Sequence, residues 1–558
     1  MKLQQYIYSV LALMVFYSLT DCQDLDYNEE TGNTKEEIFS DFTRSKSFVT
    51  GIYSYLPTDF NSIDGAIRSA ATDDAEHVND VSNIQKFNEG SYNAVEQLDN
   101  VWATMYSGIR AANVYLKESE GQQFKDLQYT NNYQILLQQY NNYPFEVRFL
   151  RAYFYFELVK RYKNIPLITT VLTPEEAAST KQASFQEVVE YIVKECDAVA
   201  AVLPPDYTAF AGVNETGRAT KGAALALKSR VLLYAASPLH NNPMDVALWK
   251  RAAAAAKEVI DLNVYLLEGG YITVVNNVSS ALSKELIFER REGASNGFET
   301  RNTPVGFQGG NTGTCPTQNL VDSYEMIATG LPITEQGSRY NPAAPYSGRD
   351  RRMALTVMFN GSSWKGNPIQ SYVGGRNGFP ITNATKTGYY LRKYMTESIN
   401  LDPKLGPVTT RERNWTIFRY GEILLNYAEA MNEAYGPSNP STLSMTALQA
   451  VNLVRRRAGM PNFPATLSPE AFRIKLQNER RVELAFEDHR FWDLRRWKIA
   501  EQTKNIFAMK ITLDANLAPV YEKKLLEVRT FDENRDYLYP IPQSEIFRNK
   551  NLIQNPGY

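Results

Sequence analysis

The sequence contains few of the residues that most often carry metal or nucleophile chemistry. Its 558 residues include only three cysteines and three histidines. The histidines, His77, His240 and His489, do not form an H-E-x-x-H motif, and there is no C-x-x-C pair. No nucleophile elbow, P-loop or dinucleotide fingerprint is present either. The sequence therefore predicts neither a bound metal nor a cofactor.

An excess of basic charge is also absent. The chain has 59 Lys and Arg against 62 Asp and Glu, a formal net charge of -3. Proteins that bind nucleic acid through its phosphates carry basic surfaces, so we expect no nucleic-acid partner. Aromatic residues, in contrast, are plentiful, with 35 Tyr, 26 Phe and 6 Trp. Such side chains suit stacking on sugars, but they equally suit packing between helices.

Residues 1–21 have the features of a secretory signal peptide. Lys2 supplies a positive charge, and residues 6–19 are almost wholly apolar. This apolar run has the length of a signal-peptide core and is short for a membrane span, and no other run is long enough to span a membrane. The sequence therefore predicts export.

A cysteine follows the apolar run directly. Leu19-Thr20-Asp21-Cys22 resembles a bacterial lipobox, although Asp21 replaces the small uncharged residue usual before the cysteine. We expect Cys22 to be lipidated; a plain signal peptide cleaved elsewhere is the alternative. Residues 22–40 are then an acidic tether, similar to the surface-export signal of Bacteroidetes-type lipoproteins. The membrane is expected to hold the protein only through this lipid anchor.

Several later segments show apolar residues at helical spacing, as in Ile417, Tyr420, Leu424 and Tyr427. These segments fall into consecutive pairs of similar length with small residues on the facing sides, which is typical of tetratricopeptide units. The predicted pairs are 146–162 with 184–201, 218–237 with 244–262, and 415–435 with 443–458. We expect a mainly α fold of about four tetratricopeptide-like helical pairs, formed by residues 41–558 as a single domain.

Between about 263 and 410 the character of the chain changes. Gly, Asn, Pro, Ser and Thr cluster there, with short β-rich runs at 285–290 and 355–359. The sequence predicts a large loop-rich insertion, and residues 503–531 read as a second, smaller irregular segment. Binding residues concentrate on loops held by a rigid scaffold, so the insertion is the expected ligand-binding region.

Three carboxylates, Glu479, Glu483 and Glu487, share one helix face. Paired carboxylates can hydrolyse glycosides, but a catalytic acid needs a raised pKa, and neighbouring arginines lower it. Arg480 and Arg481, with further arginines at 490, 495 and 496, favour an ion-pair network between helices. We therefore predict no catalytic residue and no enzyme activity.

The segment around these carboxylates also carries a specific resemblance. Asn478-Glu-Arg-Arg-Val-Glu-Leu-Ala-Phe-Glu-Asp-His-Arg-Phe-Trp-Asp-Leu-Arg-Arg-Trp497 closely resembles the C-terminal signature of the SusD/RagB family. Further blocks agree in order along nearly the whole chain. They are Trp102–Tyr106 with Asn113, Arg148–Leu158, Pro316–Tyr324, Arg419–Ala430, Asn452–Gly459, Tyr537–Ile546 and Asn551–Tyr558.

The resemblance implies a SusD-like helical body with a loop-rich face and no catalytic site. Family members are outer-membrane lipoproteins of the cell surface, and each works as a lid on a SusC-like TonB-dependent transporter. Most bind glycans, whereas the RagB branch is linked to peptides. We thus expect a nutrient-uptake protein that captures oligosaccharide or polysaccharide. The alternatives are a peptide receptor on the same fold, a secreted glycoside hydrolase, and a tetratricopeptide scaffold that binds only protein.

A sugar site needs flat aromatic faces flanked by amides, carboxylates or arginines. Such residues occur in the segment 74–92 and in the insertion, where ligand contacts of the family tend to fall, whereas Trp102 is expected to pack between helices. The candidate ligand-binding residues are Asp74, His77, Asn79, Asn88, Tyr92, Phe298, Arg301, Asn302, Phe307, Tyr346 and Trp364.

Overall fold

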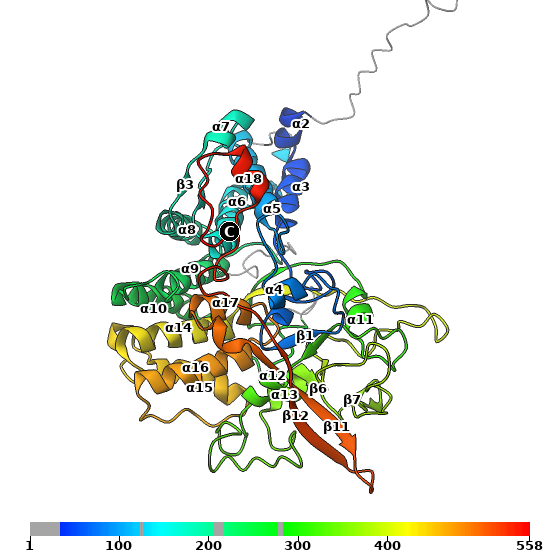
Figure 1. The fold of residues 1–558 in the computed structure, drawn as a ribbon. Coiled ribbons are helices and arrows are strands. Elements are labelled where there is room, and N and C mark those ends of the chain that lie inside the picture. Colours follow the sequence, from blue (N-terminus) through cyan, green and yellow to red (C-terminus); the bar gives the residue numbers. More distant parts are fainter. Residues whose placement is uncertain (1–33, 123, 125–126, 206–215, 277–282) are drawn as a thin grey trace, which may run out of the picture.

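The computed structural model describes residues 34–122, 124, 127–205, 216–276 and 283–558 (Figure 1). The predicted signal peptide, Cys22 and the first part of the predicted tether lie outside these residues. The end of that tether is helical, because α2 covers Lys35–Ser40, and Thr34 and Glu37 form a capping box at its start. Phe39 of α2 is buried against Phe48 and Tyr115. The folded body therefore begins ahead of residue 41.

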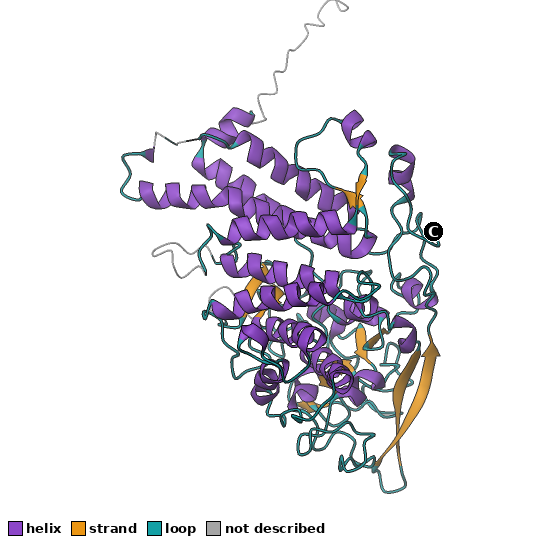
Figure 2. Cartoon of the chain, turned by 90° about the vertical axis from the view of Figure 1, so that its left-hand side faces the viewer, coloured by secondary structure: helices purple, strands orange, loops and turns teal. Residues whose placement is uncertain are grey.

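The longer helices form a continuous stack (Figure 2). In chain order they are α3 (Phe42–Tyr53), α5 (Trp102–Glu118), α6 (Tyr133–Tyr162), α8 (Phe185–Ala200), α9 (Lys221–Ala236), α10 (Val246–Asp261), α14 (Tyr420–Tyr435), α15 (Ala447–Arg457) and α16 (Pro469–Glu483). Neighbours pack in the order α5, α6, α8, α9, α10, α14, α15. The expected partners α6 and α8, α9 and α10, and α14 and α15 are confirmed as packing neighbours, and the fold is mainly helical.

Small side chains explain the close packing at the centre of the stack. On α10, Trp249, Ala252 and Ala256 lie on the buried face, whereas α9 is buried on nearly all sides between α8 and α10. Thr220 and Asp245 cap the two helices through their side chains. Since alanine combines high helix propensity with little bulk, the alanine-rich sequence of both helices allows the backbones to approach.

Shorter elements complete the body. They are η1 (Arg68–Ala71), β1 (Ala75–His77), α4 (Gln85–Glu89), β2 (Ile165–Pro166), α7 (Pro174–Ser179), β3 (Gln182–Ala183), β10 (Trp415–Arg419), η4 (Ser441–Leu443), α17 (Arg490–Arg496), η5 (Ala500–Thr503) and α18 (Gln543–Arg548). The strand β10 corrects the prediction of a helix over 415–435, because the first five residues are extended and the helix begins at Tyr420. Among the described residues, no helix is both long and apolar enough to cross a bilayer.

The described part of the insertion consists of loops with short elements. These are β4 (Leu286–Arg290), α11 (Gly297–Asn302), β5 (Thr314–Pro316), α12 (Gln318–Ser323), α13 (Arg351–Thr356), β6 (Val357–Met358), β7 (Ser363–Trp364), β8 (Asn367–Pro368) and β9 (Tyr390–Leu391). The β-rich run at 285–290 is confirmed as β4, whereas most of 355–359 is the end of α13 followed by β6. Two antiparallel pairs, β4 with β10 and β5 with β1, connect the insertion to the rest of the chain.

Residues 503–531 are not irregular, and this prediction was wrong. They contain a long antiparallel hairpin of β11 (Asn505–Leu513) and β12 (Pro519–Val528), which projects from the body (Figure 1). The signal was weak because β12 is mostly exposed, so its sequence lacks the regular alternation of a half-buried strand. The turn also lacks glycine: Leu517 adopts the left-handed conformation there, with φ 63.

Candidate functional site

The structure brings together the two regions in which ligand contacts are expected. Strand β1, from the segment 74–92, pairs antiparallel with β5 of the insertion, and His77 lies opposite Thr314. Asn302 strengthens the junction, because its Oδ1 accepts a hydrogen bond from the backbone N–H of Thr314 at 3.0 Å. Its amide nitrogen donates to Oδ1 of Asn61, also at 3.0 Å. We call the surface around this junction, where Ala75–His77 pair with Thr314–Pro316, the loop face.

Most of the candidate ligand residues are buried within the protein. The buried ones are Asp74, His77, Asn88, Tyr92, Phe298, Asn302 and Trp364. Asp74 pairs with the guanidinium of Arg481 at 2.6 Å, and the ring of Phe298 packs edge-on against Phe60. In this structure these buried side chains pack within the protein itself.

The remaining four candidates lie at the surface. Asn79 and Arg301 are exposed, and Phe307 and Tyr346 are half-buried. The guanidinium of Arg376 lies 4.7 Å from the ring centre of Phe307, which gives an aromatic surface beside a cation. Sequence reasoning missed Arg376, since nothing in the sequence places it next to Phe307.

A polar hollow of about 440 Å³ lies beside the segment 74–92. It is lined by Asp80, Gln85, Asn88, Glu89 and residues 527–530 at the end of β12. Asn88 donates to the carbonyl of Ala70 and to Oε1 of Gln85, whereas its own buried Oδ1 has no partner among the described residues. That oxygen can accept a hydrogen bond from a ligand hydroxyl.

The one arginine that lines the hollow is already occupied. Arg529 donates to the carbonyls of Thr72 and Ala75 and to the carboxylates of Glu76 and Glu527. Burial raises the pKa of Glu76 to about 7, although Arg529 opposes the effect. The hollow therefore presents mainly acceptors, which suits hydroxyl donors. Sequence reasoning missed Glu527 and Arg529 because it assigned their segment to irregular structure.

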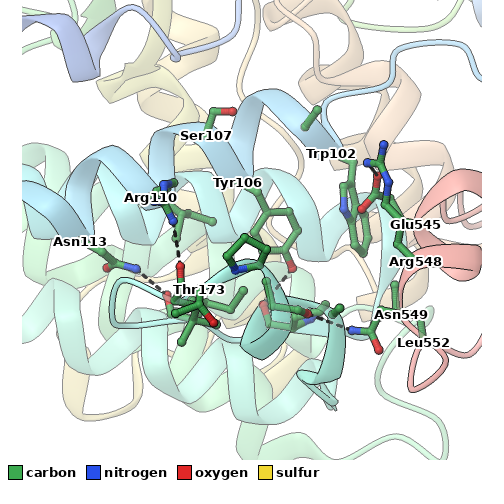
Figure 3. Close-up of a pocket in the computed structure, with 18 of the residues that line it drawn as sticks. Trp102, Tyr106, Ser107, Arg110, Asn113, Thr173, Glu545, Arg548, Asn549 and Leu552 are labelled. Carbon is green, nitrogen blue, oxygen red and sulfur yellow. Dashed lines mark hydrogen bonds and ion pairs between the residues drawn. The ribbon is translucent and has the colours of Figure 1, made fainter.

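A larger groove, of about 670 Å³, lies between α5, α7 and α18 (Figure 3). Its wall is mostly apolar and includes Trp102 and Tyr106, whose ring centres are 5.1 Å apart. The Tyr106 hydroxyl donates to the carbonyl of Pro166 at 2.8 Å, and Arg110 donates to that of Leu172 at 3.0 Å. Trp102 is buried, as expected for a packing residue. These contacts fasten the segment between β2 and α7 onto α5.

The three carboxylates of the C-terminal signature are buried in an ion-pair network, as predicted, but their partners are not the nearby arginines that the sequence suggested. Arg480 and Arg496 pair with Asp493, and Arg481 and Arg490 pair with Asp73. Glu483 receives hydrogen bonds from Arg352, Arg419 and Arg457. Burial alone would raise the pKa of Glu483, but these arginines outweigh it and hold the pKa well below its ordinary value.

The other two carboxylates on this helix face are also paired with buried cations. Glu479 pairs with Arg352 and Arg455, and Glu487 pairs with Arg419 and Lys393. Carboxylates paired with cations on every side and closed off from solvent cannot reach a glycosidic bond.

The acid-rich segment 73–80 also pairs with cations. Asp73 and Asp74 bind Arg481, and Asp73 also binds Arg490. Within the described residues, no group of three or more His, Cys, Asp or Glu side chains is placed to hold a metal ion.

By its fold the protein is a mainly helical one, in which a stack of packed helices carries a loop-rich face. Two family models match it. The SusD family matches residues 284–558, and a family described as "Starch-binding associating with outer membrane" matches residues 25–233. The chain belongs to the SusD family.

Solved structures and a curated relative agree with this assignment. A SusD-like protein from Bacteroides fragilis NCTC 9343 is 29% identical, with a TM-score of 0.78 over 95% of this chain and 99% of that chain. A SusD-like carbohydrate-binding protein from the same strain is 26% identical, with a TM-score of 0.75 over 92% of this chain and 100% of that one. SusD-like protein P25 from Formosa agariphila is 24% identical over 83% of this chain and 80% of its own length.

Proposed function

We propose that the protein is a cell-surface lipoprotein that captures oligosaccharide or polysaccharide on its loop face. It passes the glycan to a SusC-like TonB-dependent transporter in the outer membrane, where Cys22 anchors it. The observation that carries the proposal is the similarity over 92% of the chain to a SusD-like carbohydrate-binding protein. The description of the family that matches residues 25–233, which names starch binding and the outer membrane, supports it too.

The chemistry of the loop face supports the same ligand class. Phe307 offers an aromatic ring for stacking, with Arg376 beside it. Asn79 and Arg301 are exposed, and Asn88, whose buried Oδ1 has no partner among the described residues, lines an acceptor-rich hollow. A sugar ring needs both an apolar platform and hydrogen-bonding partners for its hydroxyls, and this surface supplies both.

Binding without catalysis is part of the proposal. The carboxylates on the helix face of Glu483 are occupied by arginines, so they supply no general acid. Incubation of the purified protein with a polysaccharide that it binds should release no reducing sugar. Release that disappears in Glu483→Gln would establish a glycoside hydrolase instead.

The binding test compares variants by affinity electrophoresis in gels containing neutral polysaccharides such as starch, laminarin and xylan. Arg301→Ala combined with Phe307→Ala should reduce the affinity for the polysaccharide, as measured by retardation in the gel, about tenfold. This is the effect expected for one or two lost contacts. The matched control removes a half-buried arginine and an exposed aromatic elsewhere, Arg251→Ala with Tyr129→Ala, and should bind as the wild type does. Binding to peptide mixtures alone would overturn the glycan assignment in favour of a peptide receptor.

Anchoring and delivery need separate tests. Cys22→Ala should move the protein from the outer-membrane fraction to the soluble fraction, whereas Cys196→Ala should leave it in the membrane. Affinity purification of the tagged protein from solubilised outer membranes should yield a β-barrel transporter. Recovery without any barrel would remove the delivery step and leave the glycan-binding step untouched.

A further inference from the structure

A second cavity of the helical stack has the features of a ligand site. It has a volume of about 560 Å³, within the range of small-molecule pockets. Four segments far apart in the sequence form it: the loop between α9 and α10 with the start of α10, the α14 residues near 429–433, the α16 residues near 473–477, and residues 497–502. None of its lining residues belongs to the segment 74–92 or to the insertion, so it is separate from the loop face.

Two tryptophans from different elements line this cavity. Trp249 lies on α10 and is 3% exposed, and Trp497 follows α17 and is 8% exposed. The indole N–H of Trp497 donates to Oε1 of Glu429 at 2.7 Å, which fixes the orientation of its ring. The indole N–H of Trp249 is buried and has no hydrogen-bond partner among the described residues. Buried indole N–H groups usually have a partner, so an acceptor atom of a ligand would satisfy this donor once the ring turns toward the cavity.

The rest of the lining is mostly apolar, with a few polar groups that are balanced in charge. Arg473 pairs with Glu433, with Nη2 and Oε2 2.5 Å apart, and both side chains line the cavity. Gln477 is half-buried and Gln502 is exposed, so both amides can reach a ligand at the rim. The lining contains two acidic residues, Glu429 and Glu433, and two basic ones, Arg473 and Lys498, so it favours neither anions nor cations.

We propose that this cavity is a second saccharide-binding site, which takes a neutral sugar. An apolar sugar face packs against the tryptophan-lined wall, a ring or hydroxyl oxygen accepts from the indole N–H of Trp249, and hydroxyls bond to the Glu433–Arg473 pair and to Gln477. The choice of a saccharide rests on the proposed function, whereas the existence of the site rests on the cavity. Two sites on one protein hold a polymer more tightly than either alone, because the second contact is intramolecular.

Isothermal titration calorimetry with maltohexaose, laminarihexaose and cellohexaose tests the proposal on the purified protein. We expect two sites for at least one of these probes, with a change in tryptophan fluorescence on binding. Gln477→Ala combined with Gln502→Ala should weaken the second site about tenfold, as expected for one or two lost hydrogen bonds. The control Ile474→Ala changes an exposed residue of the same helix and should alter neither site.

Trp249→Phe separates ligand binding from structure. It keeps an aromatic ring and deletes the unpartnered N–H with part of the buried bicycle, so the second site should weaken severalfold while circular dichroism shows the variant still folded at the titration temperature. A crystal soaked with the tightest probe should show a sugar against Trp249 and Trp497.

The outcomes distinguish this site from the loop face. A single site for every probe, lost in the Arg301→Ala, Phe307→Ala variant and unaffected by the glutamine variant, overturns the second site and leaves the proposed function intact. A single site lost only in the glutamine variant supports the cavity and contradicts the loop face. Absence of binding to all three probes overturns the second site, and the polysaccharide gels then decide the proposed function independently.

Discussion

Removal of the Glu483 carboxylate tests the central ion-pair network most directly. Glu483 is fully buried and accepts hydrogen bonds from Arg352, Arg419 and Arg457. In Glu483→Ala the three guanidinium groups remain, but they lose the carboxylate that they share. Breaking a buried ion pair by removal of one partner costs about 3–5 kcal/mol. Arg352 and Arg419 keep Glu479 and Glu487 as partners, but three buried guanidinium groups each lose one carboxylate at once. We expect the free energy of unfolding to fall by that amount.

The assay is guanidinium chloride unfolding followed by tryptophan fluorescence, with circular dichroism as a second probe. The matched control is Glu190→Gln on α8, which breaks an ion pair with Arg251 in which both side chains are close to half-exposed. Exposed pairs contribute about 0–1 kcal/mol, so the control should unfold almost as the wild type does. Equal effects of the two substitutions, or a loss below about 1 kcal/mol in Glu483→Ala, would show that Glu483 does not hold the buried network together.

The difference between wild type and Glu483→Ala should also depend on pH. The arginines hold the folded-state pKa of Glu483 well below the ordinary value of 4.5. A carboxylate with a lowered folded-state pKa stabilises the protein fully above its unfolded-state pKa and loses this effect as the pH falls. The advantage of the wild type should therefore be constant above about pH 5 and shrink below about pH 4.5. An advantage that grows on acidification would contradict the lowered pKa.

Three further predictions follow from buried side chains outside the binding surfaces. Phe39→Ala should cost about 3–5 kcal/mol of unfolding free energy, since the ring is buried against two aromatic neighbours; an unchanged denaturation midpoint would show that α2 belongs to the tether. Burial lowers the pKa of Lys393 to about 8, although the charge of Glu487 opposes the effect. The free energy of unfolding of the wild type, relative to that of Lys393→Met, should therefore rise by about 3 kcal/mol as the pH increases from 8 to 10.4. Chemical unfolding at these pH values measures the difference, and a fall would contradict the lowered pKa. Cys196 and Cys315 are buried, and burial raises the pKa of Cys315 to about 12, so neither thiol should react with iodoacetamide before unfolding, as peptide mass spectrometry can check.

The candidate site shows where sequence reasoning succeeds and where it stops. It placed binding groups in the segment 74–92 and in the insertion, and the pairing of β1 with β5 brings those segments together. It could not separate surface from core, because Asn79 and Asn88 are the same residue type on one short segment, and only the first is exposed. It also missed Arg376 and Arg529, whose neighbours come from distant parts of the chain.

The helical framework can be predicted from the sequence alone, because the apolar spacing and the capping residues of α8, α9, α10 and α15 are local properties. The family can be predicted too, through motifs that run in order along the chain. The sequence also predicts that Glu483 is ion-paired, but its partners Arg352, Arg419 and Arg457 come from other segments and are known only from the folded chain. The same holds for the pairing of β11 with β12 and for the convergence of four segments around Trp249 and Trp497. Pairing and cavity formation depend on contacts between residues far apart in the chain, and no local spacing encodes such contacts.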